Sequence, residues 1–174
     1  MLMDEGMDSG DILLQRETPL GTTETYGQLH DRLANQGADL LMTAIKQVIS
    51  GTALRHPQDS SAVTFAPRLT KETGRINWQE SSTNIVNLIR GLCPAPAAYA
   101  FLEGQTLKIF AAEPKPVKTK EIPGTIGAET SQGLSVAAAD GYVILKEVQL
   151  AGKKRMTINE FLRGYRLLPE TILQ

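Results

Sequence analysis

Apolar residues in the N-terminal part of the chain recur with the spacing of an α-helix. Across residues 22–50 the interval is about 3.6 residues, and the repeating positions are Leu29, Leu33, Leu40, Leu41, Ala44, Ile45 and Val48. Thr22 or Thr23 can cap the start of this helix, and Gly51 suits its end. The preceding residues 11–20 predict a strand that runs into a turn.

One strand and one helix do not make a domain. The predicted helix has an apolar face, and nothing else in residues 1–51 can cover that face. Residues 52–75 are polar, aperiodic and rich in turn formers, which is typical of a linker. The first 51 residues therefore need a partner that this segment does not contain.

A short helix is predicted over residues 81–92, with a serine cap and apolar residues on one side. The prolines that follow end it, and after Pro96 the period of the pattern changes to two. The expected elements are two strands within 98–113 around a Glu103–Gly104 turn, a polar loop at 117–124, a short strand at 124–129, a hairpin over 133–150 turning at Asp140–Gly141, and a last helix whose capping box is Thr157 with Glu160. Short strands with a helix at each end predict a small, closed or partly closed β-barrel.

Charge is distributed unevenly along the 174 residues. The formal net charge is −1, but residues 1–89 carry a net −4 and residues 90–174 a net +3. Such a difference is a weak indication that the two halves meet different partners. The length allows one domain, or one small domain and a piece of another.

Composition favours a cytoplasmic protein. No run of about 18 apolar residues is present to span a membrane, and no secretory signal is visible at the N-terminus. Cys93 is the single cysteine, which fits a reducing compartment. It has no companions for a metal site, so we expect no metal there and interpret Cys93 as a small buried residue.

Four ordered stretches carry a resemblance to a known family. They are MDEGMDSGDIL at residues 3–13, RLTKETGRINW at 68–78, IRGLCPAPAAYA at 89–100 and AGKKRMTINEFLRG at 151–164. Together they resemble methionyl-tRNA formyltransferase over the full length of this chain. The first stretch is shared with other folate-dependent formyltransferases, whereas the junction and the last stretch are typical of the tRNA-specific enzyme.

The resemblance implies a fold and a division into domains. The family has a Rossmann-like catalytic domain followed by a C-terminal barrel that resembles an OB fold. Residues 1–51 would be the C-terminal end of the catalytic domain, residues 52–75 a linker, and residues 76–174 the OB-like tRNA-binding domain. The expected fold class is therefore an α/β fragment followed by a small β-barrel with flanking helices.

The resemblance also implies a reaction. The family transfers a formyl group from 10-formyltetrahydrofolate to the methionine amino group of initiator methionyl-tRNA, and the full-length enzyme is expected to be a monomer. This acyl transfer needs proton transfer and stabilisation of an oxyanion. The family uses an Asn, a His and an Asp for it, and no metal.

By resemblance, the catalytic aspartate matches Asp8. The loop residues that would help to hold the pterin ring of the formyl donor are Met3, Asp4, Glu5, Gly6 and Met7. The family's Asn and His belong to an upstream motif, and we interpret His30 and His56 as surface residues, so we expect this chain alone to be inactive. Without the resemblance, Asp8 would be read as a turn-forming residue before Ser9.

Basic residues cluster at the junction and in the last motif. By resemblance to a positive channel in the family, the expected tRNA-binding residues are Arg68, Lys71, Arg75, Lys153, Lys154 and Arg155. Basic groups attract phosphates and give a salt-dependent affinity. The chain has only four Phe, four Tyr and one Trp, so we expect phosphate contacts and shape recognition more than base stacking. Trp78 is expected in the core at the junction.

Three other interpretations stay open at this point. The chain could be a stand-alone tRNA-binding module without catalysis, or a piece of a formyltransferase that acts on a sugar nucleotide, although the AGKKRM motif argues against the latter. It could also be a non-functional remnant or the product of a misplaced start codon. Salt-sensitive tRNA binding without turnover would single out the binding module.

Overall fold

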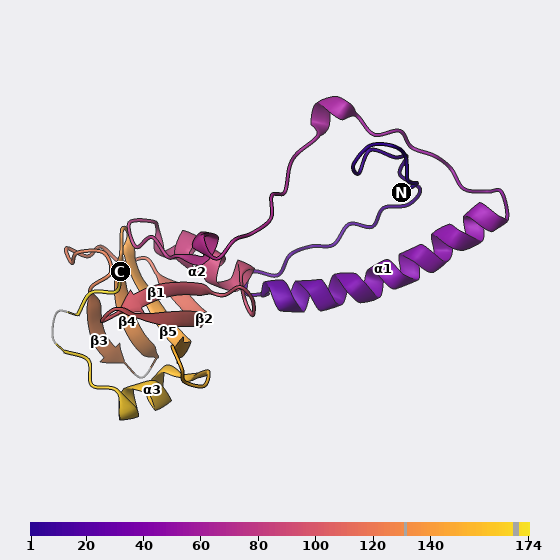
Figure 1. The fold of residues 1–174 in the computed structure, drawn as a ribbon. Helices are drawn as coiled ribbons and strands as arrows, with labels where there is room; N and C mark the ends of the chain where they lie inside the picture. The colour runs from indigo at the N-terminus through magenta and orange to yellow at the C-terminus, as the bar shows by residue number, and fades with distance from the viewer. Residues whose placement is uncertain (131, 169–170) are drawn as a thin grey trace. The chain divides into compact units, whose positions relative to one another are not determined.

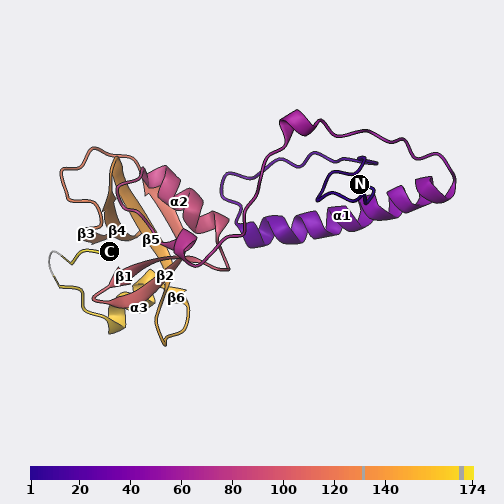
Figure 2. The same cartoon turned by 45° about the horizontal axis from the view of Figure 1, so that its top comes forward.

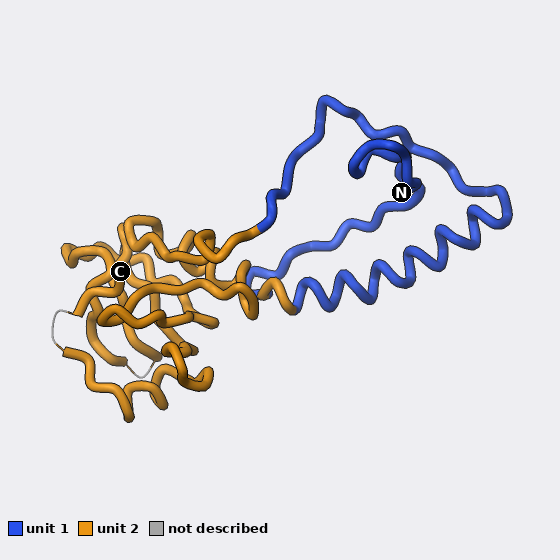
Figure 3. The backbone as a smooth tube through the Cα atoms, viewed as in Figure 1, with its two compact units in different colours: residues 1–24, 28–68 blue, residues 25–27, 69–174 orange. Residues whose placement is uncertain are grey.

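The chain divides into two units, which we describe separately (Figure 3). Unit 1 comprises residues 1–24 and 28–68, and unit 2 comprises residues 25–27 and 69–174. A computed structural model describes residues 1–130, 132–168 and 171–174.

The long N-terminal helix is confirmed. Helix α1 spans Tyr26–Ile49 and is a single long rod in Figure 1. It begins later than Thr22 or Thr23, the two predicted caps, and it ends before Gly51, whose φ of 70° lies in the left-handed region.

The apolar face of α1 is exposed. No residue of this helix is buried, and large apolar side chains such as Leu41 and Ile49 are 60% and 82% accessible. The strand predicted over residues 11–20 was wrong, because that segment forms only one isolated bridge, between Ile12 and His56. A strand needs a neighbour along its length, and the described part of unit 1 supplies one only at this residue.

Unit 2 is built on one antiparallel sheet. Its strands are β1 Ala98–Leu102, β2 Gln105–Lys115, β3 Ile126–Thr130, β4 Gly133–Ala138, β5 Gly141–Leu150 and β6 Met156–Thr157. The order across the sheet is β1-β2-β5-β4-β3, and β6 pairs with β5 (Figures 1 and 2). The predicted strands and the turn at Glu103–Gly104 are confirmed.

Two helices pack on this sheet, and both were predicted with their caps. Helix α2, Ser82–Gly91, starts after Ser81, whose hydroxyl accepts from the Asn84 amide. Helix α3, Ile158–Gly164, begins with the complete capping box of Thr157 and Glu160. Two short 3₁₀ helices span Ser60–Ala62 and Glu72–Gly74.

The β4–β5 hairpin turns one residue earlier than predicted. Ala138 pairs with Gly141, so the turn residues are Ala139 and Asp140. The carboxylate of Asp140 accepts a hydrogen bond of 2.6 Å from the backbone N–H of Ser82, at the start of α2. This bond joins the turn to a helix N-terminus, where a negative charge is favourable.

The prediction of a barrel needs correction. The described strands form an open sheet with β1 and β3 at its two edges, and no β1–β3 pairing closes it. Residues 171–174 lie between these edges instead. Ile126 donates to the carbonyl of Thr171, Leu173 donates to Gly124, and Gln174 exchanges two hydrogen bonds with Phe101. Backbone groups of both edges are therefore satisfied by a tail rather than by each other.

The main hydrophobic core lies within unit 2. It joins α2, the inner face of the sheet, α3 and Leu173, and Trp78 belongs to it at 5% exposure, as predicted. Cys93 is buried in a second small cluster with Ala97 and Phe110, also as predicted.

Truncating Leu173, the residue of the 171–174 tail that is buried in the core, should destabilise unit 2. Leu173 is 2% exposed in the core, so Leu173→Ala is expected to lower the free energy of unfolding by about 2–5 kcal/mol. Urea unfolding followed by the fluorescence of Trp78, the single tryptophan, measures this. Leu168→Ala removes a 62% exposed side chain and should change the free energy little. Equal effects of the two substitutions would contradict the role of the tail.

Asp140 should make the stability of unit 2 sensitive to acid. Its hydrogen bond from Ser82 lowers the pKa of its carboxyl group. The stabilisation is therefore complete above the unfolded-state pKa of about 3.9 and is lost as the pH falls through the lower folded-state pKa.

Asp140→Asn keeps an acceptor but cannot titrate. Wild type should be the more stable of the two at pH 7, and the difference in urea midpoint should shrink as the pH falls below the unfolded-state pKa of about 3.9. Comparing the two proteins cancels the contributions of the other carboxylates. A difference that stays constant with pH would contradict this account.

Candidate functional site

The acidic loop near the N-terminus is held by its own residues. The Leu2 amide donates to the Asp11 carbonyl over 2.9 Å, and one oxygen of Asp4 accepts from the Gly6 amide and the Ser9 hydroxyl. Gly10 is buried beneath the loop, where a Cβ would collide with the carbonyl oxygen of Leu2. A glycine is therefore required at that position.

A second segment braces the loop from outside. The side-chain amide of Gln58 donates to the carbonyls of Asp8 and Gly10, over 2.9 and 2.7 Å. Next to it, Ile12 and His56 exchange two backbone hydrogen bonds of 2.9 Å. Asp8 has a φ of 55°, in the left-handed region that Asp tolerates better than most residues. The Gln58 contact holds the backbone on both sides of Ser9.

The loop and this second segment share a hollow. It has a volume of about 890 Å³ and is lined by residues 7–9 and Ile12 on one side and by residues 57–60 and 62–67 on the other. The Phe65 ring is 90% exposed. The volume lies in the range of small-molecule sites, and the lining includes an aspartate, a methionine and an exposed aromatic residue.

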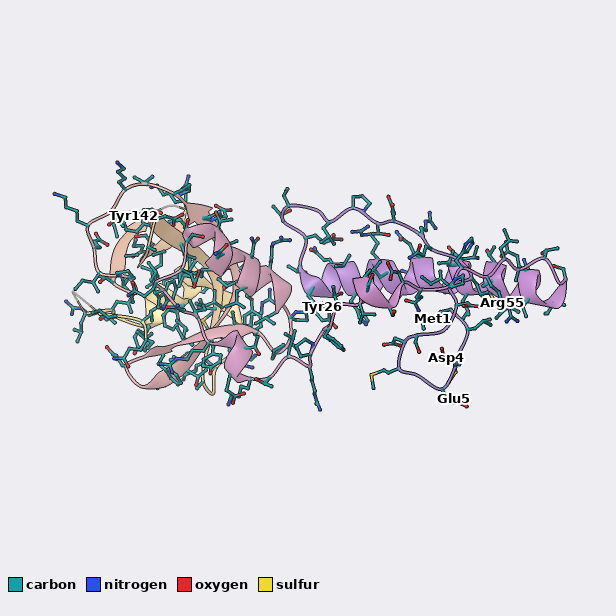
Figure 4. The ribbon with its side chains drawn as sticks, turned by 90° about the horizontal axis from the view of Figure 1, so that it is seen from above. Met1, Asp4, Glu5, Tyr26, Arg55 and Tyr142 are labelled. Carbon is teal, nitrogen blue, oxygen red and sulfur yellow. The ribbon has the colours of Figure 1, made fainter. Side chains whose placement is uncertain are left out.

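The predicted folate-loop residues are all solvent-exposed. Figure 4 shows Asp4 and Glu5 at the projecting end of the loop, and Met3 and Met7 are more than 90% accessible. Of the predicted residues, Met7 and Asp8 line the hollow, whereas the carboxylate of Asp4 is used inside the loop. Neither of the chain's two histidines is among the described lining residues.

The hairpin between β5 and β6 carries the second predicted site. The amide of Ala151 donates to the Thr106 carbonyl, that of Lys153 to the Leu150 carbonyl, and the Gln149 side chain to the Lys153 carbonyl, all within 2.8–2.9 Å. Gly152 turns the chain with a φ of 75°. Lys153 and Lys154 are exposed on this braced hairpin.

Arg155 differs from the two lysines before it. Its guanidinium forms an ion pair with Glu147 and lies over the Phe110 ring at 4.4 Å from the centroid. A cation stacked on a ring and paired with a carboxylate is partly neutralised. Arg155 therefore anchors the base of the hairpin to β5 and β2.

The junction residues fall in different units. Arg68 is exposed in unit 1, whereas Lys71 and Arg75 are exposed in unit 2. The Arg75 guanidinium lies 5.7 Å from the centroid of the Phe101 ring, and the residue forms a backbone bridge with Tyr99. The structure therefore brings Lys71 and Arg75 to the β1 side of the sheet and does not relate Arg68 to them.

Lys108 was missed by the sequence analysis. It lies between the buried residues Leu107 and Ile109, so the alternation of β2 turns it to the outer face. Its cross-strand neighbours are Tyr99 on β1 and Gln149 on β5. The alternation in TLKIF could have indicated an outward lysine, but its neighbours depend on the sheet order.

Other chemistry is not favoured within the part of the chain that the structure describes. Burial raises the pKa of the Cys93 thiol, which keeps it protonated near neutral pH. Among residues 1–130, 132–168 and 171–174, no group of three His, Cys, Asp or Glu side chains could hold a metal ion. No described helix is long and apolar enough to cross a membrane.

The fold, the acidic loop and the basic hairpin together point to one class of protein. Residues 68–166 match the family described as "Formyl transferase, C-terminal domain". This match covers more than half of the chain, which therefore belongs to that family.

Individual relatives of the chain indicate one kind of enzyme within this family. Over 173 residues the chain is 51% identical to the methionyl-tRNA formyltransferase of Syntrophus aciditrophicus, covering 99% of this chain and 55% of that protein. It is 41% identical to the methionyl-tRNA formyltransferase of Desulfotalea psychrophila, covering 100% of this chain and 54% of that protein. The chain is thus a homologue of methionyl-tRNA formyltransferases and spans about half of their length.

Solved structures agree on the fold alone. HypX from Aquifex aeolicus in complex with tetrahydrofolic acid has a TM-score of 0.68 at 18% identity, covering 95% of this chain and 30% of that one. An N-formyltransferase from Helicobacter canadensis has a TM-score of 0.61 at 19% identity, covering 88% and 53%. Both support a formyltransferase-like structure with mixed α/β content.

Removing the brace should loosen the acidic loop. Gln58→Ala deletes both hydrogen bonds to the loop carbonyls, so amide exchange at Leu2 and Ile12 is expected to accelerate about three- to tenfold. Hydrogen exchange followed by NMR measures it. The control is Gln47→Ala on α1, and unchanged exchange in Gln58→Ala would show that the brace does not order the loop.

Proposed function

We propose that this chain is part of a methionyl-tRNA formyltransferase. The enzyme transfers a formyl group from 10-formyltetrahydrofolate to the methionine amino group of initiator methionyl-tRNA, for translation initiation in the cytoplasm. The observation that carries the proposal is the 51% identity to such an enzyme across 99% of this chain. That level of identity to a tRNA-specific enzyme favours it over a sugar-nucleotide formyltransferase.

We propose the following division of the chain. Residues 1–51 are the end of the Rossmann-like catalytic domain, residues 52–75 are the linker, and residues 76–174 are the OB-like tRNA-binding domain. The separate core of unit 2 supports the last assignment. We expect the complete enzyme to be a monomer.

The acidic loop has the features of a formyl-donor site. Its hollow has room for a pterin ring, and Asp8 and Phe65 supply a carboxylate and an aromatic surface for one. Met3, Asp4, Glu5, Gly6 and Met7 would hold the ring through the loop backbone. When bound, 10-formyltetrahydrofolate supplies the formyl group.

Asp8 is the proposed catalytic aspartate. A carboxylate at this position can orient an imidazole and accept a proton through water. Neither His30 nor His56 lines the described hollow, and we propose that the imidazole is supplied by the part of the relatives that this chain does not span. We therefore propose that the chain is active only together with the part of its relatives that it does not span.

The basic residues would hold the tRNA. Lys153 and Lys154 on the braced hairpin, Lys71 and Arg75 on the β1 side, and Arg68 in the linker are suited to phosphate contacts. Arg155 would act indirectly, by anchoring the hairpin. Because unit 2 has its own core and carries most of these residues, a tRNA-binding module without catalysis is the second candidate.

A chimera tests the activity. The N-terminal part of the Syntrophus aciditrophicus enzyme that this chain does not match would be fused to the chain, and formyl-methionyl-tRNA measured. The fusion should turn over, whereas the 174-residue chain should not. Asp8→Asn should lower kcat about 100-fold or more, and Asp39→Asn on α1 should leave it unchanged.

The outcomes separate the two candidates. A fusion without turnover, beside salt-dependent tRNA binding by the chain, would leave only the binding module. Turnover by the chain alone would contradict the need for a histidine from outside it. Equal loss in Asp8→Asn and Asp39→Asn would reject the assignment of Asp8.

A further inference from the structure

A groove crosses the outer face of the sheet in unit 2. It has a volume of about 320 Å³ and is bounded by Lys71 on one side and by hairpin residues 150–152 on the other. Thr106, Lys108 and Gln149 form its floor. These residues come from three segments that are far apart in the sequence, so sheet pairing creates the groove.

The sheet register explains why Lys108 faces this groove. Lys108 pairs with Gln149, and Leu107 and Val148 beside them are buried in the core. Because successive side chains of a strand point to opposite faces, Lys108 and Gln149 must point away from the core. Directly opposite residues lie about 5 Å apart at Cβ, so the two side chains are neighbours.

The charged residues that line the groove are all positive. Its described lining contains two lysines and no carboxylate. Carboxylates elsewhere on these strands are already paired, Glu147 with Arg155 and Glu113 with Lys146. Glu72 directly follows Lys71. The pKa of the Glu72 carboxyl group is lowered chiefly by a hydrogen bond with Thr70, and Lys71 makes the smallest contribution. Lys71 and Lys108 therefore attract an anion from solvent.

The far wall of the groove is preorganised. The amide of Ala151 is bound to the Thr106 carbonyl on the floor, and the Gln149 side chain holds the Lys153 carbonyl. These two bonds fix the backbone of the hairpin beside the groove. A preorganised wall lowers the ordering cost of binding, which a group of freely moving surface lysines would not do.

We propose that this groove binds a phosphodiester of the RNA backbone, with Lys108 at its floor and Lys71 at its rim. Gln149 is a positioning residue that holds the hairpin in place. The proposal rests on the proposed function, because it takes the RNA to be the tRNA substrate. It adds Lys108 and Gln149 to the binding surface, and phosphate contacts there would strengthen binding to any tRNA rather than select the initiator.

The test is a salt titration of tRNA binding to the 174-residue chain. Lys108→Gln should weaken the affinity roughly three- to tenfold at 0.1 M salt and reduce the slope of log K against log salt by about one. Lys71→Gln with Lys108→Gln should reduce the slope by about two. Lys108→Arg should restore most of it, and initiator and elongator tRNA should be affected alike.

Lys115→Gln is the matched control. It removes the same charge from the same strand, seven residues further along β2 and roughly 20 Å away. Its slope should equal that of the wild type. The urea midpoint of each variant checks folding, and amide NMR shifts at Thr106 and Gly152 on addition of a short RNA duplex report occupation of the groove directly.

Each outcome decides the proposal separately from the function. Equal slopes for Lys108→Gln and Lys115→Gln, with turnover by the fusion enzyme, would overturn the groove and leave the function standing. If the fusion enzyme shows no turnover but Lys108→Gln still reduces the salt slope, the groove binds RNA and the proposed function is wrong. Absence of RNA binding, or binding of polyglutamate in its place, would overturn the groove.

Discussion

Unit 2 depends on strand β5, which pairs with β2, β4 and β6 at once. Four of its buried side chains lie in the middle of the core, at Val143, Leu145, Val148 and Leu150. Burial of such a side chain is worth about 1.5–3 kcal/mol, and a slip of one residue would turn all four to the opposite face of the sheet, away from the core. The core therefore sets the register of β5, and the register sets where the basic hairpin after it emerges.

The buried positions of β5 change parity between Leu145 and Val148. β2 has its register shift at the same place, between Ile109 and Ala112. Phe110, at this irregularity, leaves the main core and joins Cys93 in a separate cluster. The guanidinium of Arg155 lies over its ring and is paired with Glu147. The ring on which Arg155 of the AGKKRM motif stacks thus lies at the irregularity of the sheet.

Sequence patterns predicted the elements that are determined locally. The cap of α2, the capping box of α3 and the hairpins of unit 2 depend on residues a few positions apart, so their signals stand in the sequence itself. The closure of the sheet does not. The tail at residues 171–174 bonds to Gly124, Ile126 and Phe101, and no periodicity links segments that are 45 to 73 residues apart. The strand expected at residues 11–20 failed for the same reason, because strand pairing depends on a partner.

The residues of the candidate sites also divide into those that local sequence patterns could find and those that depend on the folded structure. The motifs located the acidic loop and both basic segments, but they could not separate Lys154, which is exposed, from Arg155, which is paired. They also could not find Gln58, which reaches the loop from 48 residues away along the chain. Lys108 was visible as an outward position of a strand, yet its proximity to Lys71 requires the order β1-β2-β5. Strand pairing therefore decides which basic residues lie together on one surface. A count of basic residues along the sequence includes Arg155, which is paired, and omits Lys108.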